Sequence, residues 1–255
     1  MKALRKMAAA LLAAASLPCA AVGGVAEVAV FDRAQGRELP VHWHEGRAWV
    51  VGQPGNEYSI RIRHRQRGDL LGVVSVDGVN VVSGETASAA QGGYVFSPWR
   101  AFDISGWRKN LASTAAFYFT SLPDSYAART GRPDNVGVIG VAFYRRKEEA
   151  PPVAQPRPAP FSSGELSRKE AASGAAPSAR AQERDDRLGT GHGRIESSPT
   201  RTVGFERATS DPAETVTIYY DSYRNLVARG VIRDARPPLA PLPRPFPGFV
   251  PDPPA

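Results

Sequence analysis

The sequence predicts an all-β protein, an antiparallel β-sandwich that is jelly-roll-like, and three observations support this. Short runs rich in Val, Ile, Phe and Tyr alternate with Gly, Pro, Asn and Asp from residue 27 to residue 146, as expected for many short strands joined by turns. No stretch in this range has the length and periodicity of a long helix. Asp77-Gly78 lies between two β-branched runs, which is a strong signal for a two-residue hairpin turn. Strands at such spacing favour a sandwich or barrel over a parallel α/β sheet.

We expect one β-sandwich domain over residues 27–146, built from its strands in chain order. The strands are expected at residues 27–33, 38–43, 47–51, 57–65, 70–76, 79–83, 93–96, 101–105, 115–121 and 136–145. The tightest hairpin should form at Asp77-Gly78, because a type I′ turn needs positive φ at both central residues.

The amino terminus has the order of a secretory signal peptide, which we place at residues 1–21. Lys2, Arg5 and Lys6 precede a short Ala- and Leu-rich run that ends before Pro18, and such a run is too short for a transmembrane helix. The expected cut follows Ala21, with a cut after Ala26 as the second choice. Either cut removes the only cysteine, so the mature chain would be periplasmic or extracellular without a disulfide. Lipidation of Cys19 is the alternative, in a context that matches it poorly.

The composition changes after residue 146. Residues 147–187 are dominated by Ala, Pro, Ser, Arg and Glu, which predicts a disordered linker because such a stretch buries little apolar surface. Residues 235–255 are so rich in proline that we expect an extended tail.

Between these stretches, residues 188–234 regain the pattern of a small β/α segment. Strands are expected at 201–207 and 214–219, followed by a short helix capped by Asp221 or Ser222 and ended by Gly230. A segment of this size is too small to be stable alone. We expect it to dock on the 27–146 domain, for example by adding a strand to a sheet edge.

Several motifs stand out along the chain. They are Val76-Asp77-Gly78-Val79-Asn80-Val81 with its continuation to residue 95, Ile104-Ser105-Gly106-Trp107-Arg108-Lys109, residues 124–131, Leu188-Gly189-Thr190-Gly191-His192-Gly193 and residues 219–227. Together they resemble an uncharacterised family of exported proteobacterial proteins. The resemblance implies export and covers most of the expected folded part. It implies no activity, because this family has no assigned catalytic residue or ligand.

Charge and motifs disfavour several classes of function. The formal net charge of +7 includes three positive residues of the expected signal peptide, so the mature chain would carry +4. This modest charge, with export, argues against nucleic-acid binding. The sequence contains no Gly-x-Ser-x-Gly elbow, and its acidic residues are explained as turn residues. His42 and His44 could face one side of a strand, but no third ligand is evident, so we expect neither a metal nor another cofactor.

A row of arginines is the first candidate site. Alternation places Arg61, Arg63 and Arg65 on one face of a strand and Ile60 and Ile62 on the other. Arginine binds phosphate and carboxylate well, so this row could contact acidic polysaccharide or lipid head groups. The alternative is an exposed face that charge protects against edge pairing.

Aromatic and loop residues give two further candidates. Trp107 beside Arg108 could begin a sugar-stacking platform, together with Trp99, Tyr94 and Tyr126, although aromatics at such spacings more often belong to the core. Tyr126 and Arg129 lie in a polar stretch between two apolar strands. Loops of this kind often carry binding residues, but many are simple crossovers.

The sequence therefore favours an exported, non-enzymatic envelope or surface protein. Its expected partners are an envelope protein or an anionic polysaccharide or lipid head group. Nucleic acid is not an expected partner, and the mature chain is expected to have no integral membrane segment. A carbohydrate-binding module, or a hydrolase with an unrecognised site, remains the alternative.

Overall fold

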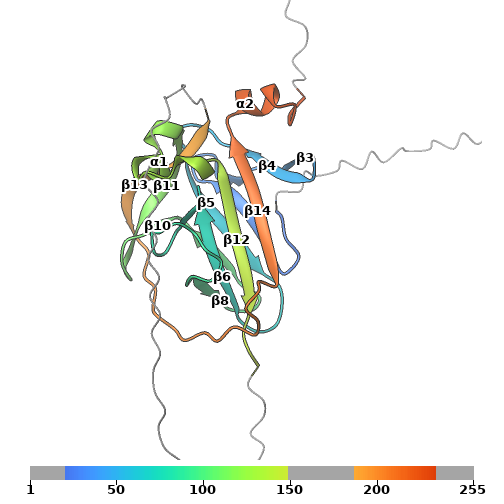
Figure 1. The fold of residues 1–255 in the computed structure, drawn as a ribbon, viewed down its shortest axis with the longest axis vertical. Helices are drawn as coiled ribbons and strands as arrows, with labels where there is room; N and C mark the ends of the chain where they lie inside the picture. Colours follow the sequence, from blue (N-terminus) through green and yellow to red (C-terminus); the bar gives the residue numbers. More distant parts are fainter. Residues whose placement is uncertain (1–20, 149–186, 234–255) are drawn as a thin grey trace, which may run out of the picture.

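The expected β-sandwich is confirmed by a computed structural model of the chain, which describes residues 21–148 and 187–233. The described residues form two seven-stranded sheets, with a few short helices at one end (Figure 1). None of the helices in the described ranges has the length and apolar character needed to cross a bilayer.

The first sheet, sheet A, has the strand order β10-β11-β5-β1-β2, with β13 paired to β11 and β9 paired to β5. Its strands are β1 (Ala26–Asp32), β2 (Arg37–Glu38), β5 (Glu57–His64), β9 (Ala101–Ile104), β10 (Gly106–Arg108), β11 (Ser113–Ser121) and β13 (Leu188–Ser197). Every pairing in this sheet is antiparallel.

The second sheet, sheet B, has the order β3-β4-β14-β12-β6-β7, with β8 also paired to β6. Its strands are β3 (His42–His44), β4 (Arg47–Val51), β6 (Leu70–Val76), β7 (Val79–Asn80), β8 (Tyr94–Phe96), β12 (Val138–Arg145) and β14 (Glu214–Asp221). The pairing of β14 with β4 is parallel, a departure from the antiparallel arrangement expected. Parallel neighbours need a long connection, and most of the domain lies between these two strands.

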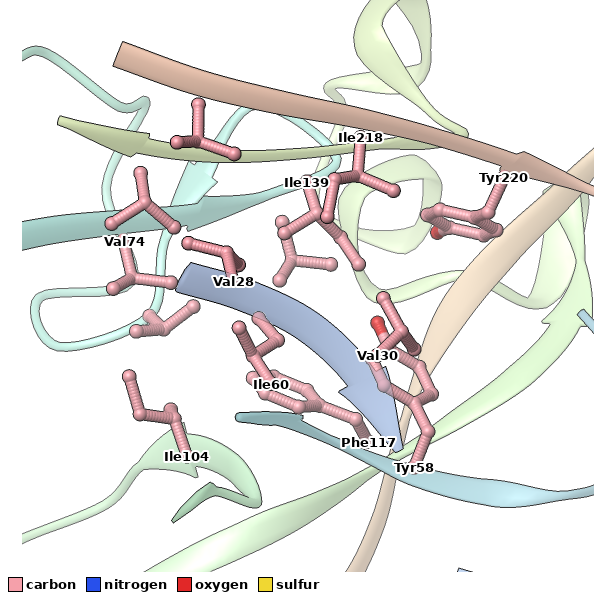
Figure 2. Packing of buried hydrophobic residues seen from close by; sticks show 14 of the residues in the cluster. Val28, Val30, Tyr58, Ile60, Val74, Ile104, Phe117, Ile139, Ile218 and Tyr220 are labelled. Atoms are coloured by element: carbon pink, nitrogen blue, oxygen red, sulfur yellow. The ribbon is translucent and has the colours of Figure 1, made fainter. Parts of the chain in front are cut away.

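The core lies between the two sheets and follows the alternation of each strand. On β5, Tyr58, Ile60 and Ile62 are fully buried, whereas Arg61 and Arg63 lie on the outer face. Figure 2 shows Tyr58 and Ile60 in the same cluster as Ile139 and Ile218 of sheet B. Apolar burial is the dominant favourable term in folding, so this shared core holds the two sheets together.

The hairpin turn at Asp77-Gly78 and the helix cap at Ser222, both predicted from the sequence, are confirmed. Asp77 and Gly78 have φ values of 52° and 73°, and they connect β6 to β7 through the pair Val76–Val79, as a type I′ hairpin requires. The short helix α2 (Tyr223–Ala228) is capped by the Ser222 side chain, which accepts from the backbone N–H of Asn225. The remaining helical turns are η1 (Leu122–Asp124), α1 (Tyr126–Arg129) and η2 (Pro133–Asn135).

Two strand expectations were wrong. The strand expected at 38–43 is divided between β2 in sheet A and β3 in sheet B, and Pro40, which lacks an N–H, lies at the break. The strand expected at 201–207 is absent: residues 201–206 have no regular structure, and Arg207 forms only an isolated bridge with Arg146.

β13 was missed because its glycines lower β propensity. A Cβ atom added to Gly191 would lie 2.2 Å from Cζ of Tyr118, so the absent side chain lets Tyr118 of β11 lie across the strand. These glycines therefore permit close packing, a role that glycine also has within strands.

The carboxy-terminal segment joins both sheets, beyond the edge addition expected for it. β13 lies at an edge of the described sheet A, but β14 lies between β4 and β12 in the interior of sheet B. The expected signal peptide, linker and proline-rich tail lie outside the described residues, except at their boundaries.

Candidate functional site: an arginine-lined groove

The segment that links the two sheets at their lower end encloses a groove. Residues 198–213, here called the bridging segment, cross from the end of β13 to the start of β14 (Figure 1). Together with β8 and the start of β6, this segment borders a cavity of about 720 Å³. The lining residues used below are Asp69, Leu71, Tyr94, Val95, Arg108, Leu111, Arg146, Arg201, Val203, Phe205 and Arg207.

The bridging segment is fastened by backbone hydrogen bonds on both sides of residues 201–205. The N–H of Thr200 donates to the carbonyl of Leu111 at 2.8 Å, and further along the N–H of Ala208 donates to the carbonyl of Arg145 at 3.0 Å. Within the described chain, residues 201–205 make no backbone-to-backbone hydrogen bond. Phe205 packs on the apolar outer surface of sheet B formed by Leu71, Val73, Ala142 and Tyr144. The segment is thus held in place, while the backbone N–H and C=O groups of residues 201–203 make no hydrogen bond to another backbone group of the described chain.

Four arginines and one acid line the groove. Asp69 pairs with Arg146 at 3.1 Å. Arg108 donates to the carbonyl of Ser198 at 2.6 Å and to the Tyr94 hydroxyl at 3.0 Å, and Arg207 donates to backbone carbonyls of residues 89–91. These acceptors are neutral, so they fix the two guanidinium groups without cancelling their charge.

Aromatic rings orient the same guanidinium groups. The guanidinium carbon of Arg207 lies 3.9 Å from the ring centroid of Tyr144, that of Arg146 lies 4.7 Å from the ring of Phe205, and that of Arg108 lies 5.5 Å from the ring of Tyr94. These are cation–π distances. In addition, Nε of Arg146 is buried and lacks a hydrogen-bond partner among the described residues. The groove therefore holds preoriented positive charge.

A second cavity of about 280 Å³ adjoins the groove between β8 and β9 and shares Tyr94, Val95, Arg108 and Thr200 with it. Leu111 and Val203 on the groove lining are 58% and 43% exposed, so the site also has apolar surface. Trp99, in the link from β8 to β9, is 66% exposed and has a φ of 59°, which is uncommon for a residue other than glycine.

The arginine row expected on β5 exists, but its charge is compensated. Arg61 pairs with Asp103 at 2.8 Å and with Glu38 at 3.4 Å, Arg63 pairs with Glu38 and Glu27, and Arg65 pairs with Glu27 at 3.1 Å. The hydrogen bonds that the Arg61 guanidinium donates to Asp103 raise its pKa.

The same outer face of sheet A, here called the arginine face, also carries Arg33 and Arg194. Both pair with Glu57 and Glu196. The hydrogen bond from Arg194, aided by the charge of Arg33, lowers the pKa of Glu57. The arginine face is therefore a balanced network of ion pairs rather than a cationic stripe.

Trp107 cannot serve as the sugar platform considered from the sequence. It is 3% exposed, and its indole N–H donates to the carbonyl of Gly191 at 3.1 Å. Tyr126 is half-buried with its ring 4.7 Å from that of Trp107 and 5.7 Å from that of His192. Arg129 is exposed at the end of α1. Of the residues singled out from the sequence, Arg108 and Tyr94 line the groove.

The histidines do not assemble a metal centre within the described chain, where no group of three or more His, Cys, Asp or Glu side chains has the required geometry. His42 and His44 flank the exposed Trp43 on the edge strand β3.

A buried polar network connects the two sheets. The Tyr220 hydroxyl donates to Oδ1 of Asp77 at 2.5 Å, the N–H of Thr190 donates to Oδ2 at 2.8 Å, and the N–H of Gly137 donates to Oδ1 at 2.9 Å. The Thr190 hydroxyl also lies 2.7 Å from that of Tyr58. Burial raises the pKa of Asp77 to about 6, despite these donors. Because all four side chains are enclosed, the network joins the sheets and is no ligand site.

No local sequence pattern marks Arg146, Arg201 and Arg207 as site residues. Their placement depends on where the bridging segment crosses, and residues 201–207 were instead interpreted as a strand.

Comparison with protein-family models, curated proteins and solved structures found no match for this chain. The resemblance to exported proteobacterial proteins stays a prediction.

Proposed function

We propose that this chain is an exported, non-enzymatic binding protein whose groove holds an extended, negatively charged ligand. One observation carries the proposal: Arg108 and Arg207 are fixed in the groove by neutral acceptors, so their charge remains available to a ligand. An anionic ligand would gain charge-assisted hydrogen bonds there, which are stronger than neutral ones. The arginine face supports this role less well, because its arginines already have carboxylate partners.

Binding accounts for the lining better than turnover does. Asp69 is the acid among the lining residues, it is paired with Arg146, and no histidine lines the groove. General acid–base catalysis needs a positioned proton donor or acceptor at the reacting group, and this lining offers poor candidates for it. An export signal would bring the groove to a compartment rich in acidic glycans, lipid head groups and exposed protein segments.

Binding of three anionic probes to the purified chain tests the proposal. The probes are polyglutamate, a sulfated polysaccharide and vesicles containing phosphatidylglycerol, each titrated at two salt concentrations. We expect at least one probe to bind more weakly as salt rises. We expect Arg201→Glu to weaken that probe by about tenfold or more.

Arg129→Glu is the matched control, because it makes the same charge change on α1 at the opposite end of the sandwich (Figure 1). Equal effects of the two variants, or no binding of any probe, would contradict the proposal.

Trp99 favours a second candidate, a carbohydrate-binding module. An exposed indole in an uncommon backbone conformation is a plausible stacking surface for a sugar ring. This candidate requires that neutral oligosaccharides shift the tryptophan fluorescence of the chain and that Trp99→Phe retain, but Trp99→Ala lose, most of that binding.

A further inference from the structure

We infer that the ligand of the groove is an acidic polypeptide segment that pairs, as an added strand, with the free edge of β8. This inference rests on the proposed function and narrows it to one class of ligand.

First, strand β8 has one edge that no other strand of the described chain covers. Its residues 94–96 pair with residues 72–70 of β6, and no other strand of the described chain pairs with β8. An edge strand presents a row of unpaired backbone N–H and C=O groups, which is a template for another strand. Tyr94 and Val95 of this strand line the groove, so the free edge borders the cavity.

The second step is the opposite wall. Residues 201–203 of the bridging segment line the same cavity, and they make no backbone-to-backbone hydrogen bond within the described chain. The fastenings at Thr200 and Ala208 hold this wall in place. Residues that have backbone groups without backbone partners therefore line the cavity on two sides, which suits a ligand that carries its own regular row of donors and acceptors.

The third step is side-chain chemistry. Successive residues of a strand point to opposite sides, so an added strand can offer one kind of side chain to each wall. The arginines call for carboxylates, whereas the exposed Leu111 and Val203 call for apolar groups. A segment in which acidic and apolar residues alternate meets both demands, and peptides are commonly bound through strand addition of this kind.

A glycan satisfies the same groove less completely. The rings of Tyr94 and Phe205, which line the groove, each have a guanidinium group within cation–π distance, so a sugar would compete with an arginine for that stacking face. A glycan also lacks the repeating N–H and C=O groups that an edge strand pairs with.

The decisive experiment uses a short, blocked, fluorescently labelled peptide of alternating Glu and Val, with binding followed by anisotropy. Two further versions carry N-methyl groups at the odd or at the even residues, which removes the N–H groups of one edge while keeping every side chain. We expect the parent peptide to bind, and at least one methylated version to bind about tenfold more weakly or worse. Equal binding of all three peptides would overturn strand pairing.

Variants of the chain locate the peptide. Val203→Glu places a negative charge on the groove lining, and we expect it to weaken the parent peptide strongly. Ile195→Glu is its matched control, since Ile195 is 59% exposed on β13 and is absent from the groove lining. Circular dichroism of both variants verifies that each is folded, and equal peptide binding by the two folded variants would overturn the placement.

The outcomes separate this inference from the proposed function. Binding of the sulfated polysaccharide or the anionic vesicles in an Arg201-dependent manner, with no binding of the peptide, would leave the proposed function standing and overturn the peptide inference. Failure of every anionic probe would overturn both.

Discussion

The arginine face and the groove are both rich in arginine, yet they differ in what surrounds each guanidinium group. On the arginine face, Arg61 and Arg63 have carboxylates from neighbouring strands. In the groove, Arg108 and Arg207 are held by carbonyl and hydroxyl oxygens. The difference teaches that an anion site depends on the partners of the arginines more than on their number.

Sheet register explains the balanced state of the arginine face. Arg63 lies directly opposite Glu27 of β1, and Arg61 lies directly opposite Asp103 of β9. Oppositely charged pairs in such cross-strand positions are stabilising. The groove arginines come from a strand end, a short edge strand and the bridging segment. Among them, only Arg146 has a carboxylate partner in the described chain, Asp69 beside the start of β6.

The largest expected effect is a loss of stability as the buried Asp77 carboxyl loses its proton, so the two regions should be compared at one constant pH. Burial raises the pKa of Asp77 from 3.8 to about 6, so the folded chain binds this proton more tightly than the unfolded chain does. The stabilisation that the protonated Asp77 adds to the free energy of unfolding is present in full below pH 3.8. It is lost as the pH rises from 3.8 to about 6, and no further change from Asp77 is expected above that pH. We expect a loss of about 3 kcal/mol across this window.

Urea unfolding of the native chain and of Asp77→Asn at several pH values measures this effect. The difference between the two proteins isolates Asp77 from the other acids that titrate in the same window. A difference that does not change with pH would contradict the assignment.

The next largest effect separates the two regions directly. Replacing Arg201 and Arg207 together by Ser should weaken an anionic probe by about 100-fold, because each charge-assisted hydrogen bond contributes about 1.5–3 kcal/mol. The matched pair Arg61→Ser with Arg63→Ser should change that binding by less than about threefold, since screening weakens distant charges. Isothermal titration calorimetry compares the two double variants, and the reverse order of effects would exchange the roles of the two regions.

Removing an acid from the arginine face should lower stability. Glu38→Gln leaves Arg61 and Arg63 with one carboxylate partner fewer, and we expect a cost of about 1 kcal/mol in the free energy of unfolding, as for other partly exposed ion pairs. Urea denaturation measures the cost. An increase in stability would show that the acids do not compensate the arginines.

Removing the acid that lines the groove should give the smallest effect, and this change should strengthen the binding of an anionic probe instead of weakening it. Asp69→Asn frees Arg146 from its carboxylate partner, so an anionic probe should bind more tightly, by about threefold. Glu38→Gln serves as the control in the same titration. Weaker binding by Asp69→Asn would mean that Arg146 needs Asp69 to hold its position.

The sequence predicted the sandwich and the strands with clear alternation, because a period of two reports directly which side chains are buried. The same alternation correctly placed Ile60 and Ile62 inside and Arg61 and Arg63 outside. It could not show that Glu27, Glu38 and Asp103 would lie beside those arginines, since register between distant strands depends on the whole fold.

The groove could not be predicted from the sequence, because it also depends on which distant segments the fold brings together. Arg108 was singled out, but as the neighbour of an indole that proved to be buried. Arg201 and Arg207 reach the groove only because the bridging segment crosses from one sheet to the other (Figure 1). No local pattern records such a crossing.

The interior position of β14 has a consequence for the order in which the protein can be made and folded. Until residue 221 has left the ribosome, β4 and β12 lack the strand that lies between them, and the edges that pair with β14 stay open. Nascent chains with such unpaired strand edges are prone to misassembly. Completion of the sandwich must therefore wait for nearly the whole described chain, from β1 to β14.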